Sequence, residues 1–193
     1  MSRTVVGILL VLVSRVAIGY PIAGVEYAPT TTLGGRTLRL LGVGMREVTV
    51  FKVDVYTLGA YVEHRTCDLA RVVPADETRM LRLHFVRDVG ADKMRANMKK
   101  SFEGHTPANA SDDLKKRIHD FVEMFGIDAK EGTEVEVRYE PASGTSVFVN
   151  GRQRGGTIPG HDFNRILWDI YFGQDTCCPS LREGVLRSCR DIQ

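Results

Sequence analysis

Three short stretches with strand-like patterning constrain this chain most: residues 42–46, 55–62 and 81–88. The first two carry Arg46 and Tyr56 in surroundings that are otherwise apolar. An arginine among valines is costly to bury unless an anionic group meets it. That anion is either a carboxylate of the protein or a bound ligand, and the choice between them is the main functional question.

The three stretches, in this order, resemble the chalcone isomerase-like family. The resemblance runs from about Gly24 to Leu186 and includes three further segments: Gly24-Val25-Glu26-Tyr27-Ala28-Pro29, Phe172-Gly173 and Pro179-Ser180-Leu181. It implies an α+β fold in which an antiparallel β-sheet packs against a layer of helices, with a ligand cleft between them. The family includes enzymes, fatty-acid-binding proteins and members of unknown role, so the resemblance does not by itself imply the isomerase reaction.

The N-terminus has the pattern of a secretory signal. Arg3 precedes an apolar run from Val5 to Val13, and Ala17-Ile18-Gly19 offers a cleavage site of small residues. An uncleaved anchor is the alternative, but the run is shorter than the about 20 apolar residues that span a bilayer. We therefore predict a signal peptide over residues 1–19 and a single domain over residues 20–193. The mature protein is expected to be periplasmic or secreted, without a membrane span.

The charge balance argues against nucleic acid as a partner. The full chain has a formal net charge of +2, and loss of the signal removes Arg3 and Arg15 but no acid. The mature chain is then neutral, whereas nucleic-acid-binding proteins normally carry a basic face.

Four cysteines, an even number, are compatible with disulfides in an exported protein. If residues 178–189 form one helix, Cys178 and Cys189 lie about 16 Å apart, too far to bond. Cys67 bonded to Cys177 or Cys178 is then one possibility, and the connectivity stays open. The spacing matches no zinc pattern and the five histidines show no recognisable site, so we predict neither a metal nor a cofactor.

Periodicity and turn residues predict the elements. Residues 25–63 have the composition of strands, with a turn at Leu33-Gly34-Gly35-Arg36 and a bulge or tight turn near Phe51. Residues 64–79 are expected to form a loop with one helical turn. The remaining strands are predicted at 80–87, 134–140 and 145–149, and helices at 91–104, 111–125, 162–172 and 179–189.

The resemblance assigns the ligand head group to Arg46 and Tyr56. A guanidinium grips a carboxylate through two parallel hydrogen bonds, and a tyrosine hydroxyl adds a third. Tyr61 is the alternative tyrosine. The apolar tail would contact four further residues, for which a plain core role is the alternative: Leu83, Phe85, Met94 and Met98.

The isomerases of this family use five side chains in catalysis, and the resemblance finds few of them in this chain. Arg46 matches the arginine that positions the anion, and the first threonine falls on Tyr56 or Thr57. The isomerase tyrosine and asparagine fall on Ala110 and Arg117, and the second threonine falls near Ile170. We therefore predict a non-catalytic binder of a fatty acid or similar amphipathic carboxylate. An isomerase with a rearranged site and a structural or partner-binding envelope protein are the alternatives.

Overall fold

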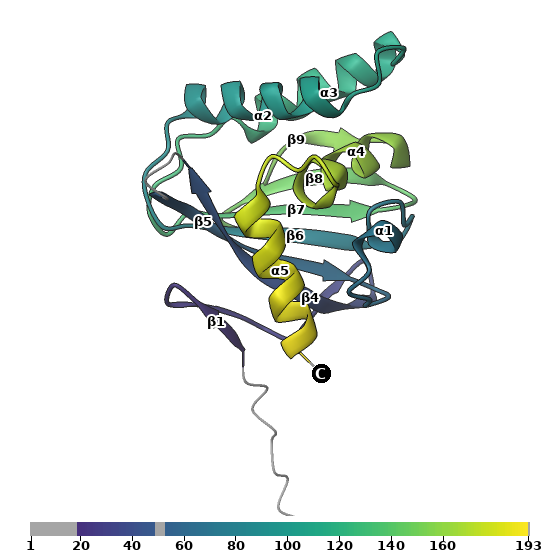
Figure 1. Ribbon diagram of the computed structural model, residues 1–193. Coiled ribbons are helices and arrows are strands. Elements are labelled where there is room, and N and C mark those ends of the chain that lie inside the picture. Colours follow the sequence, from purple (N-terminus) through teal and green to yellow (C-terminus); the bar gives the residue numbers. More distant parts are fainter. Residues whose placement is uncertain (1–18, 49–52, 193) are drawn as a thin grey trace, which may run out of the picture.

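The computed structural model describes residues 19–48 and 53–192. Its strands form two antiparallel sheets (Figure 1). The small sheet pairs β1 (Tyr20–Ile22) with β2 (Val25–Tyr27). The large sheet has seven strands, which neighbour one another in chain order: β3 (Thr30–Leu33), β4 (Arg36–Val48), β5 (Val53–Val62), β6 (Arg79–Phe85), β7 (Glu134–Glu140), β8 (Gly144–Val149) and β9 (Arg152–Ile158).

Five helices complete the described part of the chain: α1 (Leu69–Val72), α2 (Ala91–His105), α3 (Asp112–Phe125), α4 (His161–Phe172) and α5 (Pro179–Asp191). The α+β prediction is therefore confirmed, as are the four long helices and the single helical turn after residue 64. Strand β9 was not predicted, because its sequence Arg-Gln-Arg-Gly-Gly-Thr-Ile has no apolar alternation. It is an exposed edge strand that follows the Asn150-Gly151 turn.

Residues in tight turns and at helix caps set where the strands and helices begin and end. Gly34 and Gly35 have φ values of 55° and 75°, and Asn150 and Gly151 have 47° and 77°, as tight hairpin turns require. Ser111 caps α3, where its Oγ accepts a hydrogen bond of 3.2 Å from Leu114 N. The predicted bulge or turn near Phe51 lies outside the described residues.

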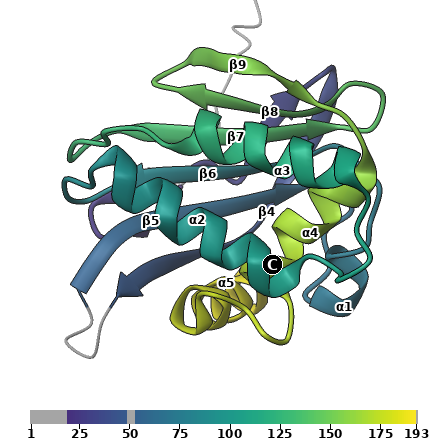
Figure 2. The same ribbon diagram turned by 90° about the horizontal axis from the view of Figure 1, so that it is seen from above.

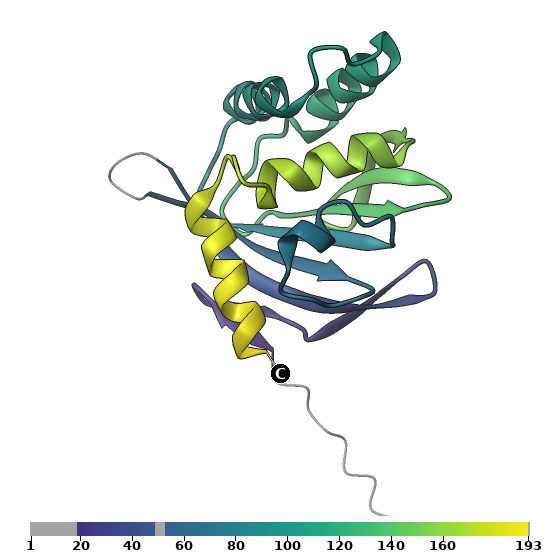
Figure 3. The same ribbon diagram turned by 45° about the vertical axis from the view of Figure 1, so that its right-hand side comes forward.

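The helices cover one face of the large sheet (Figures 1 and 2). Helix α5 lies along β4, and α4 lies between the sheet and the α2–α3 pair (Figure 3). Glycines in β4 allow the close approach of α5: a Cβ on Gly42 would lie 2.2 Å from Val185 O, and one on Gly44 would lie 2.2 Å from Leu181 O. The Gly-x-Gly segment before Arg46 is therefore explained by packing.

The opposite face of the sheet carries a second, smaller core beneath the β1–β2 hairpin. It consists of Tyr27, Leu38, Leu40, Val43, Tyr61 and Met80. The hydroxyls of Tyr27 and Thr57 lie 2.7 Å apart in this layer, and Tyr61 donates a hydrogen bond of 3.1 Å to Ala28 O.

The disulfides differ from the sequence-based possibility. Cys67 bonds to Cys189, 122 residues away, and Cys177 bonds to its neighbour Cys178. The pairing of Cys67 with Cys177 or Cys178 is therefore wrong. Cys178 and Cys189 lie at opposite ends of α5, so they are too far apart to bond, as expected. Cys67 lies beside Cys189, at the C-terminal end of this helix.

Within the described residues, no helix is long and apolar enough to cross a membrane. The predicted signal peptide lies almost wholly outside the described residues, so export stays a prediction.

Candidate functional site

A small, mostly apolar cavity lies between the sheet and the helices. Its volume is about 70 Å³, and residues from β4, β5, β6, α2, α3 and α4 line it, together with Val89 and the segment before α5. The lining consists of Arg46, Val48, Val55, Tyr56, Phe85, Val89, Met94, Asn97, Met98, Ser101, Phe125, Ile170, Tyr171, Cys177 and Cys178. Five of the six residues predicted for the site are therefore brought together around one cavity.

Leu83 is the exception among the predicted site residues. It is fully buried in the same hydrophobic core but does not line the cavity. Phe85, two residues later on the same face of β6, reaches the cavity and packs on Tyr56 with ring centroids 5.3 Å apart.

Strand pairing places Arg46 beside Tyr56. The two residues are register partners on the antiparallel strands β4 and β5. Tyr171, from α4, joins them at the cavity. The sequence analysis missed Tyr171, although it follows the inward-facing Leu167 by four residues and so lies on the same helical face.

Burial sets the protonation of the two tyrosines. It raises the pKa of Tyr56, an effect that the nearby charge of Arg46 opposes. Burial raises the pKa of Tyr171 well above its ordinary value, and the neighbouring Tyr56 raises it further. Both hydroxyls therefore keep their protons at neutral pH, and they lie within hydrogen-bonding reach of each other.

Arg46 makes no ion pair within residues 19–48 and 53–192. The other residues of the chain contain no aspartate or glutamate. Among the described residues, the half-buried guanidinium donates a hydrogen bond of 3.0 Å from Nη1 to the backbone oxygen of Glu47, and it lies within hydrogen-bonding reach of the Tyr56 hydroxyl. Arg46 lines the cavity, and a guanidinium carries five N–H donors, so an anion in the cavity can accept hydrogen bonds from it.

Tyr61, the alternative head-group tyrosine, and Thr57, the alternative position of the isomerase threonine, face away from this cavity. Tyr61 and Thr57 belong to the layer beneath the β1–β2 hairpin, where each has a hydrogen-bond partner. Because neighbouring strand residues point to opposite faces, Tyr56 reaches Arg46 and the cavity while Thr57 does not.

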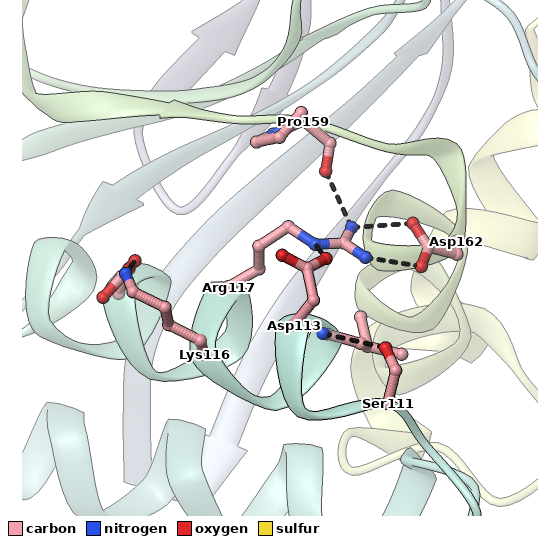
Figure 4. Close-up of polar contacts among 8 residues, drawn as sticks. Ser111, Asp113, Lys116, Arg117, Pro159 and Asp162 are labelled. Carbon is pink, nitrogen blue, oxygen red and sulfur yellow. Dashed lines mark hydrogen bonds and ion pairs between the residues drawn. The ribbon is translucent and has the colours of Figure 1, made fainter.

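The position matched to the isomerase asparagine has a structural role. Arg117 donates two hydrogen bonds of 2.8 Å to the carboxylate of Asp162, one of 2.8 Å to Pro159 O and one of 2.8 Å to Asp113 Oδ2 (Figure 4). It thereby joins α3 to the start of α4. Arg117 does not line the cavity, and neither does Ala110, whereas Ile170 lines it with an apolar side chain.

A second hollow, of about 750 Å³, is larger but has a mixed charged lining. Glu63, His64 and Glu77 meet there, with His64 Nδ1 2.6 Å from Glu77 Oε2. The sequence analysis found no site among the histidines, and this hydrogen-bonded pair accounts for His64 without a ligand. The hollow shares no lining residue with the apolar cavity, and we place the candidate site at the latter because it contains Arg46 and both tyrosines.

The fold is α+β: a curled antiparallel sheet packs against helices, with a small, mostly apolar cavity between them. A family profile described as chalcone isomerase-like matches residues 20–187. The chain belongs to the chalcone isomerase-like family.

A fatty-acid binding protein of Arabidopsis thaliana has a similar structure, with a TM-score of 0.70 and 19% sequence identity. The match covers 91% of this chain and 98% of that chain. Identity at this level shows a shared fold. No curated protein matches the sequence.

Proposed function

We propose that this protein binds a fatty acid or a similar amphipathic carboxylate in the apolar cavity, without catalysing a reaction. One observation carries the proposal: the guanidinium of Arg46 and the hydroxyls of Tyr56 and Tyr171 meet at a cavity whose other walls are mostly apolar. Such pockets bind a ligand through apolar contacts and orient it through a few polar groups. The structural similarity to a fatty-acid binding protein supports the same ligand class.

The cavity must widen when a fatty acid binds. Its 70 Å³ is well below the roughly 300–1,000 Å³ of typical small-molecule pockets. Helix α2 supplies Met94 and Met98 to one wall and packs mainly on α3 and α4. Unbranched methionine side chains change rotamer easily, so this wall yields at the lowest cost.

The residues at the isomerase positions argue against the reaction. Closing a chalcone ring needs polar groups that hold the ketone and the far end of the substrate. Ala110 and Ile170 provide none, and Arg117 is held by two carboxylates outside the cavity. A binder needs only the head-group contacts that are present.

Export is part of the proposal. The pattern of residues 1–19 supports a cleaved signal and a periplasmic or secreted protein. N-terminal sequencing of the protein from the culture medium and cell fractions tests it.

Titration of delipidated protein with dodecanoate and with dodecanol tests the binding site. Dodecanoate should bind more tightly than dodecanol, because its carboxylate accepts charged hydrogen bonds. Arg46→Ala should lower the affinity for dodecanoate about 10- to 100-fold and leave the affinity for dodecanol unchanged. Arg152→Ala, at an exposed position of the edge strand β9, is the matched control. Equal dodecanoate affinity in Arg46→Ala and the unaltered protein would remove the basis of the proposal.

A further inference from the structure

A disulfide between adjacent residues forms part of the cavity wall. Cys177 and Cys178 are bonded to each other, and both line the same cavity as Arg46 and Tyr171. Cys177 is half-buried and Cys178 is fully buried.

This disulfide does not serve the usual stabilising purpose. A disulfide stabilises a fold chiefly by shortening a loop of the unfolded chain, and the effect grows with the length of that loop. The Cys67–Cys189 bond spans 122 residues, whereas the Cys177–Cys178 bond spans a single peptide unit. Breaking the adjacent pair therefore releases almost no additional freedom in the unfolded state.

Two features of the surroundings of Cys178 act on its thiolate in opposite directions: the start of α5 stabilises a negative charge, and full burial in the hydrophobic core disfavours it. Cys178 is the N-cap residue of α5, a helix of 13 residues that begins with Pro179, and its own side chain makes no capping hydrogen bond. A negative charge near a helix N-terminus is stabilised by the helix dipole. A stabilised thiolate is also the better leaving group in disulfide exchange.

The disulfide is connected to the backbone of two cavity residues of α4 through Thr176. The Oγ1 atom of Thr176 accepts a hydrogen bond of 3.1 Å from Cys178 N. The same Oγ1 lies 2.9 Å from Ile170 O and 2.8 Å from Tyr171 O. A change at the disulfide therefore reaches two residues of the cavity through one short segment.

We propose that Cys177–Cys178 is a thiol–disulfide exchange site through which a dithiol reductant changes the ligand cavity; this inference deepens the proposed function and rests on it. A thiolate of the reductant attacks Cys177 Sγ, the S–S bond breaks, and Cys178 leaves as a thiolate that takes up a proton. The second thiol of the reductant then releases Cys177 as a thiol and closes the reductant's own disulfide. The two separated sulfurs no longer fit the space of the bonded pair, so the wall of a 70 Å³ cavity rearranges.

Graded reduction with dithiothreitol, followed by alkylation and peptide mass analysis, tests the exchange without any ligand. Trypsin places Cys67, Cys189 and the adjacent pair on three separate peptides. We expect Cys177 and Cys178 to be alkylated at a lower dithiothreitol concentration than Cys67 and Cys189. Simultaneous alkylation of all four cysteines, or the reverse order, would overturn the proposal.

Amide hydrogen exchange of the oxidised and selectively reduced protein tests the effect on the cavity. Faster exchange in residues 166–178 after reduction is expected, and unchanged exchange there would contradict the link to the cavity. Dodecanoate affinity should fall about 5-fold or more on reduction, the lower end of common coupling effects. The double variant Cys177→Ser/Cys178→Ser should bind like the reduced protein and lose the response to dithiothreitol.

The two proposals fail in different ways. If neither oxidised nor reduced protein binds dodecanoate, the fatty-acid proposal fails, while the alkylation order and amide exchange still decide whether the exchange site exists. If dodecanoate binds equally in both states, control of the cavity by the disulfide is refuted and the binding proposal stands.

Discussion

Arg46 and Tyr56 lie directly opposite each other on β4 and β5, and both side chains line the same cavity. Sheet pairing therefore holds the two groups next to each other. Tyr171 reaches the same cavity from α4, a different layer of the fold. The head-group site consequently depends on the packing of α4 against the sheet as well as on the strand register.

Removing the hydroxyls of Tyr56 and Tyr171 should weaken carboxylate binding less than removing Arg46. A neutral hydrogen bond contributes about 0.5–1.5 kcal/mol, so each Tyr→Phe change should lower dodecanoate affinity roughly 2- to 12-fold. Isothermal titration of both variants measures this. Tyr61→Phe is the control, because its hydroxyl donates to Ala28 O on the other face of the sheet. An equal loss in Tyr61→Phe would show that the effect is not specific to the cavity.

Chalcone cyclisation should proceed at the same rate with and without this protein. The reaction needs aligned polar groups around the ketone, and Ala110 and Ile170 supply none. The loss of chalcone absorbance over time measures the rate, with heat-denatured protein as the control. A rate that rises in proportion to protein concentration would instead favour an isomerase with a rearranged site.

The Arg117–Asp162 contact should make the free energy of unfolding fall as the pH is lowered in the acidic range. The Arg117 guanidinium lowers the pKa of Asp162 below its value in the unfolded chain, which is about 3.9. The charged carboxylate therefore stabilises the fold above about pH 4, and this contribution is lost as the pH falls through the lower folded pKa. Urea unfolding of the unaltered protein and Asp162→Asn measures the effect.

The two urea midpoints should differ at pH 6 and approach each other at pH 3. Asp120→Asn is the control, because the Lys116–Asp120 pair is an exposed contact within one helix and contributes little. A gap between Asp162→Asn and the unaltered protein that stays constant from pH 6 to pH 3 would mean that the charge of Asp162 is not its source.

Gly44→Ala should destabilise the fold by about 1–3 kcal/mol, since the added Cβ would press on α5 at Leu181 O. Gly104→Ala is a control of opposite sign. No atom lies within 4 Å of a Cβ at Gly104, which is within α2, so alanine should stabilise the helix by about 0.5–1 kcal/mol. Chemical denaturation measures both. If Gly44→Ala leaves the free energy of unfolding unchanged, α5 can shift on β4 to make room for the added Cβ at no cost.

Local signals in the sequence were sufficient to predict much of the fold. Ser111 and Gly126 mark the ends of α3, and Gly34-Gly35 marks the β3–β4 turn, because caps and tight turns depend on residues only a few positions apart. The alternation in residues 80–87 likewise predicts β6. The family resemblance predicted Arg46 and Tyr56 as the residues that contact the ligand head group, and in the structure both line the cavity.

Other features depend on contacts that no local pattern encodes. The Cys67–Cys189 bond requires the C-terminal end of α5 to lie beside the loop before α1. Tyr171 reaches Arg46 only through the packing of α4, and the Arg117 contact joins two helices 45 residues apart. Short-range periodicity and turn chemistry thus predicted most helices and strands from the sequence, though not β9. The docking of the helices on the sheet decided which side chains meet, because it depends on the packing of the whole core.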